Sequence, residues 1–486
     1  MQRTIGSTAG GTESAAADRR SRWTALIVLC IGMFMIVLDG TVVNVALPAI
    51  QSDLGFTQSS LAWVVNAYLI AFGGLLLLAG RLGDLLSRRG MFLSGLGVFT
   101  VASLLCGLAP TKELLVAARF VQGVGGAMTS AVVLGMIVTL FPGQREQAKA
   151  IGAYGFVATA GASVGLLAGG VLTQVLSWHW IFMINIPIGL ITGFVALRLL
   201  PADRGVGVGR DTDFLGAALI TGSLMLGVYT IVTPAAELGW TAPQTLLLAG
   251  ATLVLLIAFV AREATARNPL VPLRIFRSRN VSGANAIQAL TVAGMFGMFF
   301  LGVLYLQQVL GYDALQTGLA FLPTTVVIGT LSLRYSERLI TQFGARTVLL
   351  PGLVLIAAGL ALFARVPVPG NYLTDVLPPT LLMGVGIGVS FPTLAALAMS
   401  GATEDDAGLA SGLVNTTMEV GAAVGLAVLA TLSATRTREL AAAGVNAVTA
   451  LTGGYQLAFL IGAALVVVAL VIGLVVLRNE PKPETE

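Results

Sequence analysis

The chain has 486 residues, of which 56% are hydrophobic and 10% are charged, and its formal net charge is +4. Soluble domains carry about a quarter charged residues, so this composition excludes a soluble globular protein. Apolar runs of about 20 residues recur from end to end, and each is long enough to cross a bilayer core. Because backbone polar groups inside a bilayer must be satisfied within the span, the sequence predicts an all-α integral membrane protein.

The first 22 residues are polar and rich in Ser, Ala and Gly, which predicts a disordered N-terminus for residues 1–22. The apolar segment that follows is too long for the core of a signal peptide and has no convincing cleavage site, so we interpret it as the first span. Cys30 and Cys106 both lie in apolar runs and indicate no disulfide framework.

The apolar runs predict fourteen transmembrane helices. In chain order, they cover residues 24–47, 60–80, 91–109, 113–141, 149–172, 181–200, 213–233, 246–262, 282–308, 316–335, 346–365, 378–399, 407–432 and 455–477. The predicted organisation has five parts: the N-terminus 1–22, a six-helix bundle 23–200, two inserted helices with cytoplasmic linkers 201–281, a second six-helix bundle 282–477, and a tail 478–486.

Positive charge fixes the predicted orientation. Most of the 27 lysines and arginines fall on the side of the N-terminus. The opposite side receives Lys112, Arg365, Arg436 and Arg438. Since positive residues concentrate in cytoplasmic loops, both termini are predicted to be cytoplasmic. The basic pI is thus an orientation signal, and we expect no nucleic-acid partner.

Four motifs stand out in chain order. The first predicted span contains "LDGTVVNVALP" (38–48), with Asp39 inside an apolar run, and the loop after the second span reads "GRLGDLLSRRG" (80–90). The fourth span contains "LLVAARFVQGVGGA" (114–127), and the fifth contains "GASVGLLAGG" (161–170). A weaker echo of the loop, "SERLITQFGAR" (336–346), aligns Arg346 with Arg89 and predicts two related, pseudo-symmetric halves.

Together these motifs resemble those of the major facilitator superfamily, specifically its 14-span drug–proton antiporter branch (EmrB/QacA-like). The chain departs from that pattern at Ser87, where the family usually has Gly, and at Leu166, where it normally has Pro. The resemblance implies two packed bundles and antiport. Glycines recurring every four residues in the fifth span suit close helix packing, with or without antiport: Gly161, Gly165 and Gly169, followed by Gly170.

In the family, the loop after the second span latches one half to the other on the cytoplasmic side. The matching residues here are Gly80, Arg81, Gly83, Asp84, Arg88 and Arg89. Acidic residues at the start of the thirteenth span, Asp405 and Asp406, are predicted partners near a helix N-terminus. The simpler alternative is that these arginines only orient the chain in the membrane.

Buried charges are the candidate proton-coupling groups. From the helical rise, Asp39 lies roughly 13 Å and Arg119 roughly 9 Å below the outer ends of their spans, so the two are predicted to be close. They form either a proton switch or a static ion pair. Glu419 is predicted near the bilayer midplane, where it binds a proton or a cationic substrate, or stays permanently protonated.

Polar residues within other spans are candidates for lining a substrate cavity: Gln122, Asn285, Gln288, Tyr305, Gln308 and Asn415. Hydrogen bonding between helices is the alternative for the Asn285/Gln288 and Tyr305/Gln308 pairs. The single histidine, His179, lies between two tryptophans and is interpreted as an interfacial residue.

The expected function is proton-coupled export of drugs, antibiotics or similar amphipathic small molecules by alternating access, from a monomer in a bacterial cell membrane. No lysine completes a phosphate-binding loop, and no catalytic or metal-binding cluster is visible, so we expect neither an enzyme nor a cofactor or metal. The alternative is a transporter of the same fold that exports a specific metabolite or takes one up with protons.

Overall fold

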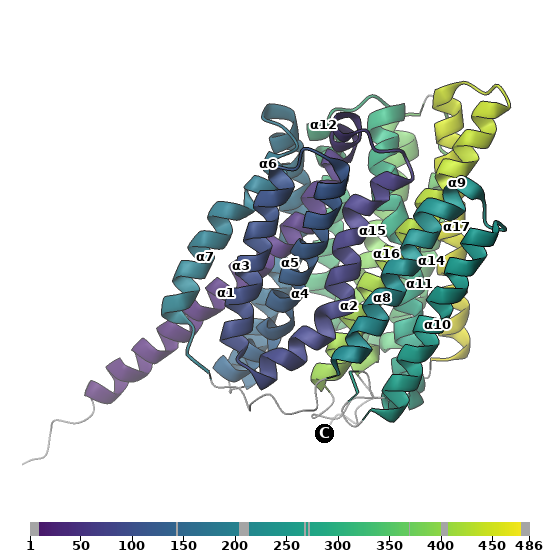
Figure 1. Ribbon diagram of the computed structural model, residues 1–486. Coiled ribbons are helices and arrows are strands. Elements are labelled where there is room, and N and C mark those ends of the chain that lie inside the picture. The colour runs from purple at the N-terminus through teal and green to yellow at the C-terminus, as the bar shows by residue number, and fades with distance from the viewer. Residues whose placement is uncertain are drawn as a thin grey trace, which may run out of the picture.

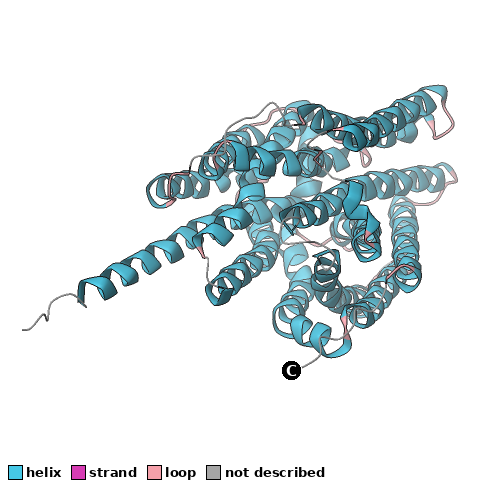
Figure 2. Cartoon of the chain, turned by 90° about the horizontal axis from the view of Figure 1, so that it is seen from below, coloured by secondary structure: helices cyan, strands magenta, loops and turns pink. Residues whose placement is uncertain are grey.

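The structure, a computed structural model, describes residues 9–141, 144–203, 213–266, 269–270, 273–368, 370–399 and 407–477. Long helices run side by side and are joined by short loops, and the described residues contain no strand (Figures 1 and 2). The all-α prediction is confirmed for these residues.

The N-terminal half contains α1 (Ala9–Leu54), η1 (Ser60–Ala62), α2 (Trp63–Leu85), α3 (Arg88–Gly107), α4 (Lys112–Leu140), α5 (Gln144–Val175), α6 (Trp180–Met183) and α7 (Asn185–Leu199). The inserted region contains α8 (Phe214–Thr230), the π-helical turn η2 (Ile231–Ala235), α9 (Ala236–Leu238), α10 (Pro243–Thr265) and η3 (Leu273–Arg277).

The C-terminal half contains α11 (Arg279–Leu304), η4 (Tyr305–Val309), α12 (Ala314–Thr330), η5 (Leu331–Tyr335), α13 (Ser336–Phe343), α14 (Ala345–Phe363), η6 (Tyr372–Val376), α15 (Leu377–Met399), α16 (Ala407–Ala442) and α17 (Ala447–Val475). Within the described part of the chain, twelve helices are long and apolar enough to span a membrane, and two shorter apolar helices cover Ser60–Leu76 and Val164–Val175. The chain is therefore a multi-pass membrane protein, while the count of fourteen spans stays a prediction.

Two boundaries differ from the sequence prediction. Helix α1 begins at Ala9, so residues 9–22 are helical where we expected disorder, and Figure 1 shows this helix projecting from the bundle. The run Ala15–Ala17 has the highest helix propensity, and extending an existing helix costs little. Helix α16 runs ten residues beyond the predicted end at 432. In this polar extension, Arg436 and Glu439 form an ion pair three residues apart, at 3.3 Å, which supports the helix.

The two halves repeat one contact. Arg89, at the start of α3, donates to the carbonyl oxygen of Leu197 in the last turn of α7. Arg346, at the start of α14, donates to the carbonyl oxygen of Leu474 in the last turn of α17, at 2.7 Å. The sequence echo aligned these two arginines. Their matching partners therefore support two related halves, in which a guanidinium binds the unpaired carbonyls at a helix C-terminus.

Small residues bring α5 close to two other helices. A Cβ at Gly165 would lie 2.0 Å from the Thr41 hydroxyl oxygen of α1, and a Cβ at Gly169 would lie 2.7 Å from the Val42 carbonyl oxygen. A Cβ at Gly170 would lie 2.7 Å from the Ala314 carbonyl oxygen of α12, in the other half. The glycine face thus packs α5 against α1 and also against the opposite bundle.

Of the two inserted helices, α8 lies along α2 and α16, and α10 packs against α8 (Figure 1). A Cβ at Gly74 of α2 would lie 2.8 Å from the Thr221 hydroxyl oxygen of α8. On the other side, the Thr431 hydroxyl of α16 donates to the Ile231 carbonyl oxygen at 3.2 Å. The insertion therefore covers the line along which α2 of one half meets α16 of the other.

Candidate functional site

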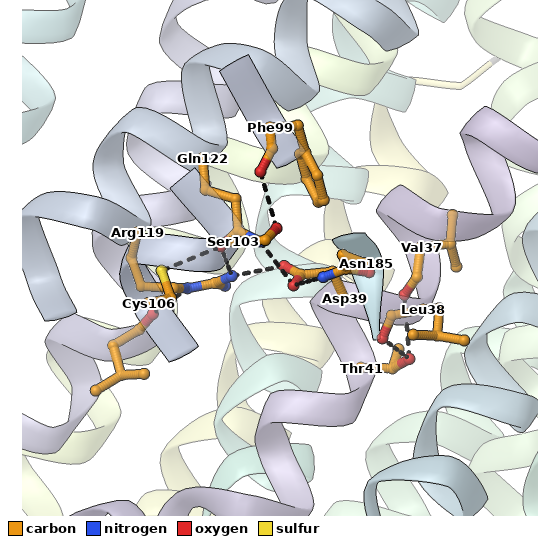
Figure 3. A network of polar contacts seen from close by, with 11 residues as sticks. Val37, Leu38, Asp39, Thr41, Phe99, Ser103, Cys106, Arg119, Gln122 and Asn185 are labelled. Atoms are coloured by element: carbon orange, nitrogen blue, oxygen red, sulfur yellow. Dashed lines mark hydrogen bonds and ion pairs between the residues drawn. The ribbon is translucent and has the colours of Figure 1, made fainter. Parts of the chain in front are cut away.

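Asp39 lies in the middle of a closed hydrogen-bond network (Figure 3). Its Oδ2 accepts from Arg119 Nη1 at 2.6 Å. Its Oδ1 accepts from Gln122 Nε2 and from Asn185 Nδ2, each at 2.8 Å. The carboxyl side chain has 0% of its surface exposed and the Arg119 side chain 1%. The structure confirms that the two charges predicted at similar depths are in contact.

Arg119 has further partners within the N-terminal bundle. Its Nε donates to the Val64 carbonyl oxygen of α2 at 2.9 Å, and its Nη1 also donates to Gln122 Oε1 at 2.7 Å. The guanidinium carbon lies 4.4 Å from the centre of the Tyr68 ring. The charge is thus held by a carboxylate, an amide, a carbonyl and an aromatic face, which compensate its removal from water.

Gln122 belongs to this network and is fully buried in this structure, so its assignment to a substrate cavity stays a prediction. It follows Arg119 by three residues on α4, and this spacing turns both side chains toward α1. Its Nε2 also donates to the Ser103 hydroxyl oxygen of α3 at 2.8 Å. The orientation of the Gln122 amide is therefore fixed by two acceptors and one charged donor.

The sequence analysis did not single out Asn185 or Ser103. Asn185 is the first residue of α7, two residues before Pro187, and it is fully buried. The available signal was an amide within the otherwise apolar stretch "FMINIPIGL" (182–190). A polar side chain in a span is costly and usually has a partner. Its partner, however, depends on how α7 packs against α1, which the sequence does not reveal.

Chemically, the network surrounds the Asp39 carboxyl group with hydrogen-bond donors next to Arg119. Three donors satisfy the two carboxylate oxygens, and the arginine supplies the compensating charge. In a low-dielectric interior such a pair contributes little net stability, because desolvation offsets the attraction. Removing the charge of either partner would leave the other charge buried without compensation.

Glu419 lies in a different setting, in the middle of α16. The Glu419 Cβ lies 2.7 Å from where a Cβ at Gly73 of α2 would be, so the acid sits directly over the opposite bundle. Its side chain is partly exposed and makes no hydrogen bond or ion pair with any described residue. The structure thus offers no support for the alternative of a hydrogen-bonded acid. Asn415, one turn earlier on α16, is also partly exposed.

Asn285 and Gln288 contact α16 rather than an open space. The Thr417 hydroxyl donates to Asn285 Oδ1 at 3.0 Å, and Gln288 Nε2 donates to the Val414 carbonyl oxygen at 3.2 Å. Both side chains are buried. These contacts favour the alternative in which the two residues join α11 to α16.

Tyr305 and Gln308 lie in the π-helical turn η4, at the predicted outer end of the bundles. The Tyr305 hydroxyl donates to the Pro367 carbonyl oxygen at 3.2 Å. Gln308 Nε2 donates to Gln51 Oε1 of α1 at 3.0 Å, and Gln308 Oε1 accepts from the Tyr455 hydroxyl at 2.8 Å. Tyr305 therefore packs within its own half, while Gln308 joins the two halves.

The latch residues are described only in part. Gly80 and Gly83 lie on the face of α2 that meets α4, and a Cβ at Gly83 would lie 2.3 Å from Val132 Cγ1. Arg88 donates to Gly135 O at 3.1 Å and to Thr139 Oγ1 at 2.9 Å, both on α4. The side chains of Arg81 and Asp84, and the whole of Asp405 and Asp406, lie outside the described residues.

Ser87 caps α3 together with an acid from beyond α7. The Ser87 hydroxyl accepts from the Gly90 N–H and donates to Asp203 Oδ1 at 2.6 Å. The Arg88 N–H donates to Asp203 Oδ2 at 2.6 Å. Partial burial opposes ionisation of Asp203, but these hydrogen bonds outweigh it and lower the pKa of the carboxyl. The residue that departs from the family pattern thus has a structural role at a helix N-terminus.

Residues 29–426 match the family model described as Major Facilitator Superfamily. The chain belongs to the major facilitator superfamily. Over 484 residues it is 39% identical to the puromycin resistance protein of Streptomyces alboniger, covering 97% of this chain and 95% of that one. It is also 39% identical over 416 residues to the cephamycin export protein of Amycolatopsis lactamdurans, covering 85% of each.

The fold is shared with solved superfamily structures. A bacterial homologue of the human lysosomal transporter Spinster, in an inward-facing and unoccupied conformation, matches with a TM-score of 0.67 and 15% identity. The match covers 93% of this chain and 96% of that one. The chain is therefore a membrane transporter of the major facilitator superfamily, and its substrates are small molecules.

Proposed function

We propose that this transporter is a proton-coupled antiporter that exports antibiotics or similar amphipathic compounds across the cytoplasmic membrane by alternating access. Relatives that confer puromycin resistance or export cephamycin support this cargo class. The proposal includes a monomer with fourteen spans, both termini in the bacterial cytoplasm, and a latch formed by the loop after α2. Glu419 and Asn415 are the proposed cavity residues.

The buried pair of Asp39 and Arg119 carries the proposal. A carboxylate with three donors and no exposed surface needs a reason to persist in a span, and reversible protonation supplies one. If rocking of the bundles separates Asp39 from Arg119, or wets the site, the affinity of Asp39 for a proton changes. Uptake of a proton on one side and its release on the other then drives export.

Replacing Asp39 by Asn tests this mechanism. The amide keeps one hydrogen-bond acceptor but does not titrate, so we expect Asp39→Asn to insert normally and lose transport driven by a pH gradient. Inverted membrane vesicles with an imposed gradient measure uptake of puromycin and ethidium directly. Asp53→Asn, the same change at an exposed position of α1, is the matched control and should transport normally. Full coupled transport by Asp39→Asn would refute the role of Asp39.

A second candidate is a transporter for one specific metabolite, working as an exporter or as a proton symporter. The partly exposed acid Glu419, which no described residue neutralises, favours selection by charge rather than by hydrophobicity alone. The vesicle assay separates the two directions. When the lumen of the inverted vesicles is more acidic than the medium, protons that leave the lumen drive substrate uptake by an antiporter. A symporter takes up substrate only when the medium is the more acidic side.

A further inference from the structure

Tyr68 of α2 lies between the two acidic sites. Its ring face carries the Arg119 guanidinium, whose carbon is 4.4 Å from the ring centre. The side chain of Tyr68 is almost fully buried. It lies within electrostatic range of Asp39 and Arg119 in its own bundle and of Glu419 in the other. A described aromatic residue thus connects the buried pair to the acid across the bundle interface.

The ring is held in a fixed orientation. Tyr68 stacks on Phe72, one turn along α2, with 5.6 Å between ring centres. Gly126 of α4 leaves the room that both rings need, because a Cβ there would lie 3.1 Å from the Tyr68 hydroxyl oxygen and 2.9 Å from Phe72 Cδ2. The next residue of α2, Gly73, is the one over which Glu419 sits. The segment 68–73 therefore contacts Arg119 at one end and Glu419 at the other.

We infer that Tyr68 is a positioning residue whose ring face keeps the Arg119 guanidinium on Asp39 and, when Asp39 is protonated, keeps that positive charge within reach of Glu419. Among the residues that the structure describes, few charged or titratable groups lie near Asp39. The charged or titratable ones are Arg119 of α4, Tyr68 of α2 and Cys106 of α3, while α7 contributes the neutral Asn185. Glu419 of α16 lies beyond Tyr68, next to Gly73 of α2.

This inference rests on the proposed function and deepens it. A proton on Asp39 removes the negative charge, but Arg119 keeps the Val64 carbonyl, the Gln122 amide and the Tyr68 ring as partners. Its charge then stays in place without compensation and disfavours a cation at Glu419. Proton and cationic substrate exclude one another, which is a negative coupling between two sites. The inferred substrate class is a monovalent, amphipathic organic cation.

Infrared titration of Asp39 in the purified full-length protein tests the role of Tyr68. The band of the protonated acid is identified by its loss in Asp39→Asn. In Tyr68→Leu the guanidinium is less well held, so the Asp39 carboxylate loses stabilisation. The midpoint of protonation should then move to higher pH by about one unit, the order of a desolvated cation–π contact. Tyr68→Phe keeps the ring face and should restore the original midpoint.

Two controls keep the outcome decisive. Phe92→Leu removes a similarly buried ring. The rings found against the Arg119 guanidinium among the described residues are those of Tyr68 and Phe182, so the midpoint of Asp39 protonation in Phe92→Leu should not move. If Tyr68→Leu does not fold, mono-, di- and trifluorophenylalanine at position 68 preserve the shape while weakening the ring face, and the midpoint should rise stepwise. An unchanged midpoint in Tyr68→Leu, a flat fluorine series, or equal shifts in Phe and Leu variants would overturn the inference.

The titration uses no transported compound, so its failure is distinct from failure of the antiport proposal. Binding of tritiated tetraphenylphosphonium then examines the coupling itself. Affinity should fall as Asp39 becomes protonated, and in Tyr68→Leu this fall should begin at the shifted midpoint. Binding that does not depend on the protonation of Asp39 would contradict mutual exclusion.

Discussion

Two acids within the spans of this transporter have opposite surroundings. Asp39 accepts three hydrogen bonds and contacts a guanidinium, so its ionised form is fully compensated. Glu419 has no hydrogen-bonding or ionic partner among the described residues, and it faces the other bundle at Gly73. A carboxyl group that the described residues do not satisfy suits the proposed binding of a proton or a cation.

The difference predicts a substrate-selective defect. Glu419→Gln keeps the shape of the side chain and removes its charge, so export of cationic compounds should fall at least tenfold while export of neutral compounds persists. Efflux of ethidium and of a neutral fluorescent dye from loaded cells measures both. Glu439→Gln, an exposed acid on the same helix, should affect neither. Equal loss for the two dyes would remove charge recognition from the role of Glu419.

At the level of residues, the sequence identified the charged side chains inside the spans, which are expensive to bury, but not all of their partners. Asp39 and Arg119 were predictable because a charge in a span is rare and their depths are countable from helix ends. Asn185 and Ser103 are ordinary polar residues whose importance arises where α1, α3, α4 and α7 cross. Gln122 was recognised by motif, but its bonds to Asp39 and Arg119 were not foreseen, because a one-dimensional pattern does not tell a cavity from a core.

Helix termini and irregular turns determine which elements meet. The π-helical turn η4 directs two consecutive residues to α1, since Gln307 Nε2 donates to the Val45 carbonyl oxygen at 3.0 Å and Gln308 contacts Gln51. An ordinary helix would point neighbours about 100° apart. At the opposite end, Asp203 reaches from beyond α7 to the N-terminus of α3 and joins two helices of one bundle.

The Asp203 cap predicts a pH dependence of stability. Because its pKa is lowered in the folded protein, Asp203 stabilises the fold above the unfolded value of about 3.9 and loses that effect as pH falls through the folded value. Asp203→Asn should lower the melting temperature by a few degrees at pH 7 and flatten the acid-side decline. Melting in detergent from pH 7 to pH 3 measures this. Glu237→Gln, an exposed acid near α9, is the control, and identical acid profiles would contradict the prediction.

On the scale of the whole molecule, the predicted outer ends of the two bundles are in contact. Gln308 bridges to Gln51, and α5 meets α12 at Gly170. The proposed alternating access requires these contacts to open, and we therefore propose that they form a gate. The echo around Arg89 and Arg346 predicts two related halves, and the matching contacts of these arginines support them. Which ends of the bundles touch in this structure was not predictable, because the same sequence adopts every conformation of the proposed transport cycle.

Cross-linking the gate should arrest transport. With Cys30 and Cys106 replaced by Ala, the variant Gln51→Cys/Gln308→Cys should be cross-linked by a short bis-methanethiosulfonate, which forms a disulfide with each cysteine and releases sulfinate. The cross-linked protein should lose export and recover it after reduction. Each single-cysteine variant should keep its activity under the same treatment. A cross-linked protein that still exports at the full rate would show that these ends need not separate.

The inserted helices are attached unequally to the two bundles. The outer half of α16 binds them through Thr431 and Arg438, which donate to the carbonyl oxygens of Ile231 and Ala236. On the other side, α8 approaches α2 at Gly74, which has no side chain. Because their hydrogen bonds go to α16 while α2 meets them at a glycine, we expect the inserted helices to move with the C-terminal bundle if the two bundles rock. They would then cover the line where α2 meets α16, while α5 and α12 meet on a flank that they do not cover.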